Sequence, residues 1–370
     1  MRATENTAEA RRTIEICNAC RYCETYCAVF PAMTLQRAFT DEDLGYFANL
    51  CHNCKGCYQA CQYAPPHEFG VNLPQTFAEL RNETYEEYAW PNGSGRLFER
   101  NGTIVSLAAA AAIAFVLIAI MALRSPGILY APQTGPGAFY RIVPWGVMTA
   151  FAGAAFIYAI VAMAIGAMRF WKDTQSDLSG PITLKALARA LHDAATLRYL
   201  GNDGKGCNDL DDQYSQTRRR LHHLMAYGFL LCFAATSVAT VYDHFLNWPA
   251  PYPVLSWPVM LGTFGGVGLT VGTIGLIWVK IVTDPAPVSR KVAGGEYALL
   301  TLLLLAAVTG LVLLAARETA AMGILLAVHL GIILALFLAL PYSKFVHSVY
   351  RSAALLKAAI ERERNKPLGE

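Results

Sequence analysis

The sequence predicts an all-α protein in which a small cysteine-rich module precedes a bundle of six membrane-spanning helices. Two observations predict this organisation. Apolar residues make up 55% of the 370-residue chain and charged residues only 15%, which is not the composition of an ordinary soluble protein. Eight of the ten cysteines lie within the first 61 residues, where polar and apolar residues are mixed. The net charge of +3 is too small to indicate a nucleic-acid partner, and we expect none.

Two identical cysteine runs define the chemistry of the N-terminal module. Each run reads C-x2-C-x2-C-x3-C, the spacing with which bacterial ferredoxins hold [4Fe–4S] clusters. In proteins with two such runs, the fourth cysteine of each run usually ligates the other cluster. The spacing therefore predicts a first cluster on Cys17, Cys20, Cys23 and Cys61, and a second on Cys51, Cys54, Cys57 and Cys27. The repetition of a four-cysteine run argues against the alternatives, a zinc site or a disulfide framework.

The segment between the two runs predicts that the module is helical. Apolar residues of the segment 31–50 follow a helical rather than an alternating pattern: Leu35, Phe39, Leu44, Phe47 and Leu50. No proline directly follows the last cysteine of either run, which departs from the ferredoxin pattern. We therefore expect residues 1–96 to form a cytoplasmic, helical, ferredoxin-like domain with two clusters, as in subunits of succinate and heterodisulfide reductases. His52 and His67 are expected to be polar neighbours of the clusters.

From about residue 103 the chain becomes strongly apolar. A helix needs about 20 apolar residues to cross a hydrocarbon core of about 30 Å. Six stretches meet this requirement within a membrane domain over residues 97–370: roughly 103–123, 145–168, 222–246, 257–282, 296–316 and 321–343. The fourth stretch is rich in glycine, which predicts close helix packing or a cofactor against the backbone. The loop at 169–220 is too long for a simple connection and predicts a helix of its own at 181–200.

The distribution of Lys and Arg predicts the orientation of the bundle. Nine of these residues lie in the loop at 169–220, and the loop at 283–295 and the C-terminal tail carry more. The loops on the opposite side hold few. Since positively charged loops stay in the cytoplasm, both termini and the clusters are predicted on the cytoplasmic side of a bacterial inner membrane. The pair Arg11–Arg12 is not followed by an apolar segment, so we expect no cleavable signal.

Five histidines lie in or beside the predicted spans: His222, His223, His244, His329 and His347. Ionisable side chains within a bilayer are costly and indicate a function. On one continuous helix, His329 and His347 are 18 residues apart (347 − 329) and would share a face with a separation of roughly 27 Å. His222 or His223 would then lie level with His347, and His244 roughly level with His329.

This arrangement predicts one or two b-type haems, each held by a pair of histidines. A C-x-x-C-H motif is absent, so the haem would be bound non-covalently. Alternatively, His222, His223 and His347 are uncoordinated interfacial side chains. His244 can also serve a quinone site beside Tyr242, Trp248 and Tyr252, and the segment 218–223 is a second quinone candidate. Cys207 and Cys232 are expected to be ordinary free cysteines; the alternative for Cys207 is a ligand or a redox thiol.

The chain resembles the tricarballylate-utilisation protein B family, also known as the citrate-utilisation protein B family. The resemblance extends over nearly the whole chain, including the segment with His329 and His347. It rests on these segments: ICNACRYCETYCAVFPAM at 16–33, NLCHNCKGCYQACQYAPPHEF at 49–69, RRRLHHLMAYGFLLCFAAT at 218–236 and APYPVLSWPVMLGTFGG at 250–266. The family is similar to the membrane half of a flavin, haem and iron–sulfur oxidase of cobalamin biosynthesis, which supports the haem prediction.

The resemblance implies a membrane partner of a separate FAD-dependent dehydrogenase that oxidises tricarballylate or a similar tricarboxylate. Such a protein passes electrons from the reduced flavin through its clusters to the quinone pool. We expect no substrate site in this chain itself, because no dinucleotide-binding fingerprint is present. The alternatives are a quinol-oxidising subunit that feeds a soluble reductase, and a component of a cobalamin-biosynthesis-like oxidase. A transporter or redox sensor is a further alternative, but the spans show no inverted repeat of broken helices.

Overall fold

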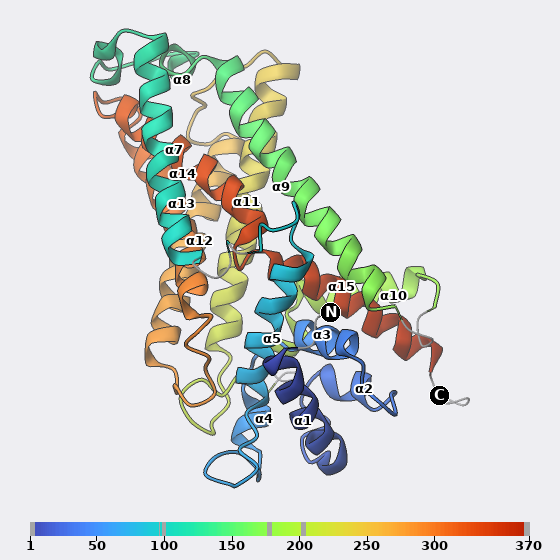
Figure 1. Cartoon of the computed structure of the whole chain (residues 1–370). Coiled ribbons are helices and arrows are strands. Elements are labelled where there is room, and N and C mark those ends of the chain that lie inside the picture. The colour runs from blue at the N-terminus through green and yellow to red at the C-terminus, as the bar shows by residue number, and fades with distance from the viewer. Residues whose placement is uncertain (1–3, 96, 98–100, 176–179, 201–204, 366–370) are drawn as a thin grey trace.

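The computed structural model describes residues 4–95, 97, 101–175, 180–200 and 205–365. It confirms the predicted all-α class, since the only strand-like pairing among these residues is an isolated bridge between Cys207 and Ser215. Figure 1 shows a bundle of long helices above a group of short helices from the start of the chain, drawn in blue. The predicted domain boundary at residue 96 lies outside the described residues and remains a prediction.

The N-terminal module is a set of short helices: α1 (Glu5–Cys20), α2 (Val29–Met33), α3 (Asp41–Leu50), α4 (Gly56–Gln59) and α5 (Leu73–Tyr88). Leu44 and Phe47 of α3 are fully buried, as their helical spacing predicted. The segment 31–50 nevertheless holds parts of two helices rather than one. The backbone of Thr40 is extended, and its hydroxyl accepts a hydrogen bond from the Asp43 N–H, so that Thr40 caps the start of α3.

Six helices in the described residues are long and apolar enough to cross a membrane, and they fit a multi-pass membrane protein. Their bounds are α7 (Asn101–Leu123), α9 (Trp145–Asp173), α11 (Thr217–Phe245), α12 (Trp257–Val282), α13 (Ala293–Ala316) and α14 (Met322–Ala339). Two short elements, η1 (Pro126–Leu129) and α8 (Ala138–Ile142), connect α7 to α9 at the end far from the module (Figure 1).

The helix that carries His329 does not continue to His347. After α14 the chain forms a short 3₁₀ turn, η3 (Leu340–Tyr342), and a separate helix, α15 (Val346–Arg364), follows. Pro341 has no N–H and cannot continue an α-helix, and Ser343 then adopts an extended backbone with φ −114° and ψ 175°. The prediction that the two histidines share one helix face is therefore wrong.

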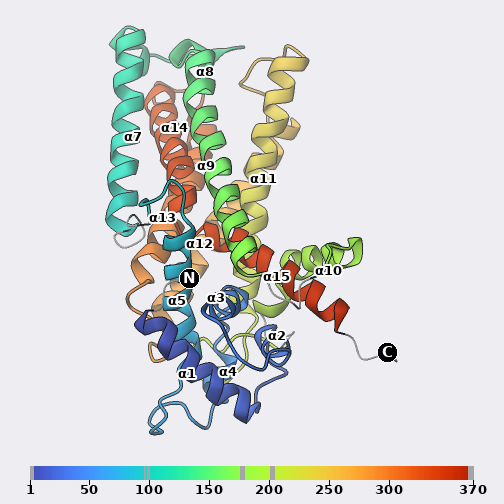
Figure 2. The same cartoon turned by 45° about the vertical axis from the view of Figure 1, so that its right-hand side comes forward.

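Helix α15 joins the module to the bundle. In both views it runs crosswise at the lower part of the bundle, between the N-terminal helices and the end of α9 (Figures 1 and 2). The Lys357 ammonium donates a hydrogen bond to the carbonyl of Thr174, just after α9, and Tyr46 of α3 donates one to the Glu361 carboxylate at 2.9 Å. The predicted helix of the long loop is present as α10 (Leu184–Ala195), and it packs against α15.

Helices α11 and α12 approach each other backbone to backbone. Gly228 of α11 faces Gly265 of α12, and a Cβ atom added to Gly265 would lie 2.8 Å from both the Gly228 carbonyl oxygen and the Cys232 nitrogen. Neither group is the end of a flexible side chain that could move aside. The glycines of the fourth span therefore provide the close helix packing that the sequence predicted.

A Gly265→Leu variant is expected to unfold at a lower temperature than the parent protein. Overpacking of this kind costs about 1–3 kcal/mol or more, because the two helices must separate. The apparent midpoint of thermal unfolding in detergent, followed by circular dichroism at a fixed scan rate, measures the effect. Gly153→Leu in α9 is the matched control, since a Cβ atom there meets nothing within 4 Å. Equal losses in the two variants would contradict the assigned contact.

Candidate metal centres

The four cysteines of the first predicted set line one small pocket: Cys17, Cys20, Cys23 and Cys61. Two of them lie in the last turn of α1, where the left-handed backbone of Arg21 (φ 53°) ends the helix and reverses the chain. This reversal returns Cys23 to the pocket, and Cys61 arrives from the end of α4. Burial, followed by the neighbouring thiols of Cys23, Cys61 and Cys20, raises the pKa of Cys17 to about 12.

The second set is more deeply buried and repeats the same local geometry. Cys51 directly follows α3, and Cys54 is followed by Lys55, whose left-handed backbone (φ 66°) starts α4. Lys55 thus takes the position in the second run that Arg21 takes in the first. Burial, followed by the thiols of Cys51 and Cys54, raises the pKa of Cys27 well above its usual value. The fourth cysteine of the first run is therefore placed beside the second run, while Cys57 completes this group from within α4.

The ligand type of both groups fits iron–sulfur clusters. Each set consists of four cysteine thiols, and four cysteine thiolates are the ligands of such a cluster. The N–H of Asn53 points at the Cys51 sulfur at 3.4 Å, and hydrogen bonds of this kind tune a cluster. In the described part of the chain, no three His, Cys, Asp or Glu side chains converge on a single-ion site. Which cysteine ligates which cluster remains a prediction.

Three arginines surround the second set, and sequence analysis did not predict this position for any of them; Arg218 was named only as part of a quinone candidate. Arg81 of α5 and Arg351 of α15 both donate hydrogen bonds to the Cys51 carbonyl, at 2.5 and 2.9 Å. Arg218 of α11 donates to the Asn53 carbonyl at 2.8 Å. Their positive charges would stabilise the reduced form of a cluster held by this set and so raise its potential. No spacing rule could have identified them, because three helices far apart in the sequence supply one residue each.

His222 of α11 and His347 of α15 face each other next to these arginines. Their ring centroids are 6.2 Å apart and their planes lie at 84°. Metal–imidazole bonds are about 2.0–2.1 Å long, so two imidazoles on opposite sides of one ion have centroids about 6 Å apart. The Nδ1 of His222 is buried without a hydrogen-bond partner among the described residues, whereas the Nδ1 of His347 contacts the Lys344 carbonyl. His222 and His347 are thus the two residues that would hold the iron of a b-type haem, which would supply one-electron transfer there.

Of the two adjacent histidines of α11, only His222 faces His347. The ring of His223 instead packs on Tyr227 of the same helix, with centroids 5.8 Å apart. The two side chains therefore have different surroundings, and the sequence could not choose between them.

The expected second pair, His244 with His329, is not formed among the described contacts. His244, at the end of α11, packs on Trp145 with ring centroids 4.6 Å apart. The Nδ1 of His329 lies 2.9 Å from the Thr309 hydroxyl of α13. Gly310 makes room for this imidazole, since a Cβ atom there would lie 3.0 Å from its Cε1. His329 is thus held by polar contact with α13 rather than by a second histidine.

Two further predicted neighbours of the clusters have local hydrogen bonds. His52 follows Cys51 and is buried, with its Nδ1 2.9 Å from the Leu50 carbonyl. The Nδ1 of His67 accepts a hydrogen bond from the Phe69 N–H at 3.1 Å. Both rings are therefore fixed by the backbone.

Cys207 forms part of the wall around the second set. It is fully buried, and its Sγ lies 2.5 Å from the Leu200 carbonyl oxygen. Burial raises the pKa of Cys207 to about 12, so the group is a protonated thiol at neutral pH. The next residue, Asn208, donates its N–H to the Cys54 carbonyl at 3.0 Å. The loop at 169–220 therefore covers the second cysteine run near Cys54.

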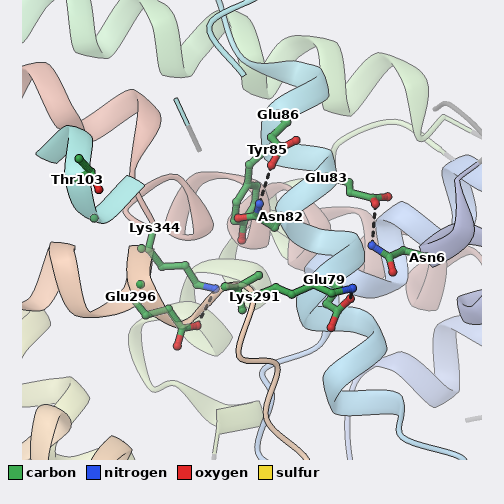
Figure 3. A pocket seen from close by; sticks show the side chains of 14 residues that line it. Asn6, Glu79, Asn82, Glu83, Tyr85, Glu86, Thr103, Lys291, Glu296 and Lys344 are labelled. Carbon is green, nitrogen blue, oxygen red and sulfur yellow. Dashed lines mark hydrogen bonds and ion pairs between the residues drawn. The ribbon is translucent and has the colours of Figure 1, made fainter. Parts of the chain in front are cut away.

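A polar cavity of about 560 Å³ lies where the module meets the bundle. Figure 3 shows it between α5 and the first turns of α7 and α13, with charged side chains on its walls. Glu79 of α5 pairs with Lys291 at 2.8 Å, and Glu296 of α13 pairs with Lys344 at 2.9 Å. The same Glu79 carboxylate accepts a buried hydrogen bond from Ser289 at 2.9 Å, so α5 contacts the loop that leads into α13 at two points.

Comparisons with known proteins agree with this architecture. The family model described as "Citrate utilization protein B" matches residues 96–368, and that described as "Citrate utilization protein B Fer4-like domain" matches residues 10–87. A relative named citrate utilization protein B, from Escherichia coli, is 48% identical over 367 residues, which cover 99% of this chain and 95% of that protein. No solved structure matches the chain. The resemblance drawn from the sequence motifs is confirmed, and the chain belongs to the citrate utilization protein B family.

Proposed function

We propose that this protein transfers electrons from a reduced flavoprotein dehydrogenase to membrane quinone through two [4Fe–4S] clusters and a b-type haem. One observation carries the proposal. The first cysteine set, the second cysteine set and the pair of His222 and His347 form a continuous series from the exposed part of the module to the membrane helices. When bound, the clusters and the haem supply one-electron transfer, and the protein positions them and adjusts their potentials.

The first cysteine set lies where a soluble partner can approach it. Tyr22, between the second and third cysteines of the run, is 71% exposed. An open groove of about 550 Å³ runs beside Cys61 and is lined by Tyr58 and His67 among others. Exposed aromatic side chains are typical of protein interfaces. We therefore propose that the FAD-dependent dehydrogenase docks here and delivers its electrons to the first cluster.

The second set connects the first set to the membrane. Burial, followed by the Cys23 thiol of the first set, raises the pKa of Cys57 well above its usual value, and this influence of Cys23 supports neighbouring positions for the two sets. On the other side, Arg351 donates to the Cys51 carbonyl and lies four residues after His347 on α15. Four residues of an α-helix rise about 6 Å. The proposed haem and the second cluster are therefore close neighbours.

We propose the bundle end near Arg218 and His223 as the quinone site. This end adjoins the proposed haem, which can therefore pass electrons to a bound quinone. At the opposite end of α11, the ring of Tyr242 packs against Trp248 and Tyr252 at centroid distances of 5.3 and 5.5 Å. Such a cluster is typical of the aromatic belt at a membrane interface. The aromatic belt therefore accounts for the aromatic residues at the opposite end, and we do not place the quinone site there.

The family supports a role in the use of citrate or a related tricarboxylate. The sequence resemblance narrows the partner's substrate to tricarballylate or a similar tricarboxylate. The excess of Lys and Arg in the loop at 169–220 supports a bacterial inner membrane location with both termini in the cytoplasm. Under this arrangement the module faces the soluble flavoprotein, and the bundle holds the haem within reach of quinone.

A stepwise reduction experiment tests the proposal. The full-length protein, purified anaerobically and placed in lipid nanodiscs, is mixed with a purified FAD-dependent tricarballylate dehydrogenase and its substrate. We expect the Fe–S absorbance to bleach and a b-type α-band to appear, both only with substrate present, and both to reverse when quinone is added. If the clusters and the haem stay oxidised in the presence of the reduced flavoprotein, the flavoprotein is not the electron donor. Reduction by quinol followed by flavin reduction would instead establish the opposite direction of flow.

A further inference from the structure

We infer that α10 is an in-plane membrane anchor, which inserts an apolar stripe into the bilayer surface on the module's side and binds anionic phospholipid headgroups with a basic flank. The inference does not depend on the proposed electron transfer. It follows from the three faces of this helix, from its level relative to the membrane helices, and from its charge.

Helix α10 has three separate faces. The apolar face is exposed and consists of leucines at helical spacing: Leu184, Leu187 and Leu191. Leu184 is 83% exposed and Leu191 is 62% exposed. On the opposite side, Ala186 and Ala190 are buried in the region where α10 packs against α15. The leucines therefore point away from the protein, and water would be a costly environment for such a stripe.

The start of α10 is fixed to α15 and its end to the membrane helix α11. At its start, the Thr183 hydroxyl donates to Glu363 of α15 at 2.5 Å, six residues beyond the Lys357 that contacts the end of α9. At its end, Tyr227 of α11 donates its hydroxyl to the Ala195 carbonyl at 2.9 Å.

The contact from Tyr227 sets the depth of α10. This residue lies ten positions (227 − 217) after the start of the membrane helix α11, or roughly 15 Å along its axis. Figure 2 shows α10 lying crosswise beside the lower end of α9, outside the bundle. A helix at this level, with its leucines turned away from α15, has its apolar face at the boundary between headgroups and acyl chains.

The charge of α10 indicates which lipids it contacts. Lys185 and Arg189 are exposed on a flank between the apolar face and the buried face. Thr196, just after the helix, accepts hydrogen bonds from Arg219 of α11 at 2.6 and 3.0 Å, which brings a further cation to the same level. Apolar and basic faces side by side are the pattern of helices that lie on anionic membranes. A second copy of the chain would have to match both faces, whereas a bilayer supplies both environments at once.

Site-specific photocrosslinking tests the inference. Full-length protein carrying p-benzoylphenylalanine in place of Leu187 is placed in nanodiscs of phosphatidylglycerol and phosphatidylcholine and irradiated, and the adducts are identified by mass spectrometry. Position 264 on the membrane face of α12, where Phe264 is 67% exposed, is the positive control. The exposed position of Tyr22 in the module is the negative control. We expect lipid adducts at positions 187 and 264 and none at position 22.

The other outcomes contradict the inference. Crosslinked dimers at position 187 would identify a second copy of the chain as the occupant, and a chain without lipid or protein adducts would show that the face is open to water.

The double variant Lys185→Glu/Arg189→Glu tests the basic flank separately. We expect a several-fold loss of phosphatidylglycerol adducts at position 187 with little change at position 264. An equal loss at both positions, or no loss at either, would remove headgroup binding by the basic flank from the inference.

Discussion

A Cys20→Ser variant is expected to lose the first cluster and nearly all quinone reduction by the partner dehydrogenase. The protein should retain about four of about eight iron atoms, because each [4Fe–4S] cluster needs four ligands and the serine hydroxyl is a poor substitute for a thiolate. The second set takes no ligand from this position, so its cluster should remain. Iron and acid-labile sulfide per chain, together with the electron paramagnetic resonance spectrum of the reduced protein, measure the loss.

Cys232→Ser is the matched control for this variant. Cys232 lies in α11, outside both cysteine sets, so its replacement should leave the iron content and the turnover unchanged. Full iron content and normal turnover in Cys20→Ser would exclude Cys20 as a ligand. Loss of all iron would instead show that the two clusters do not assemble independently.

A His222→Ala variant is expected to lose the b-type haem absorbance while it keeps both clusters. With one axial imidazole removed, His347 alone must hold a non-covalent haem, and the proposed path from the second cluster to quinone is interrupted. The difference spectrum between dithionite-reduced and air-oxidised protein, with pyridine-haemochrome quantitation, gives the haem content per chain. Quinone reduction should fall by a similar factor, whereas Fe–S bleaching by the reduced flavoprotein should persist.

The adjacent His223→Ala variant provides the control, because its ring packs on Tyr227 and does not face His347. It should keep its haem content. His329→Ala should also keep the haem, since His329 contacts Thr309 and not the proposed pair. If His222→Ala and His223→Ala lost haem to the same extent, the pair seen in the structure would not be the haem site. A half-loss of haem in His329→Ala would reveal a second haem.

The class of fold could be predicted from the sequence because its signals are local. Long apolar stretches and a fixed cysteine spacing are properties of neighbouring residues, and the structure has the six long helices that the stretches predicted. The break before His347 was missed for a related reason. An apolar run continues through Leu340, so hydropathy alone cannot distinguish one helix from two, although Pro341 gave a signal that could have been used.

The surroundings of the candidate centres could not be predicted. Arg81, Arg218 and Arg351 meet around one turn of backbone only because α5, α11 and α15 converge there. The choice of His222 over His223 depends on the rotation of α11 about its own axis, which its even distribution of apolar residues does not determine. Such features follow from tertiary packing, and a single sequence records them only indirectly.

Helix α15 also limits how far the N-terminal module and the bundle can move relative to each other. It carries His347 and Arg351 on one rigid rod, and its later turns are fastened to α3 and to the end of α9. An α-helix bends far more easily than it stretches, so thermal motion of the N-terminal module relative to the bundle should leave the distance between the turn at Cys51 and His347 nearly constant. Helix α15 therefore acts as a spacer of fixed length, and changes in the thickness of the surrounding bilayer should hardly alter the distance between the turn at Cys51 and His347.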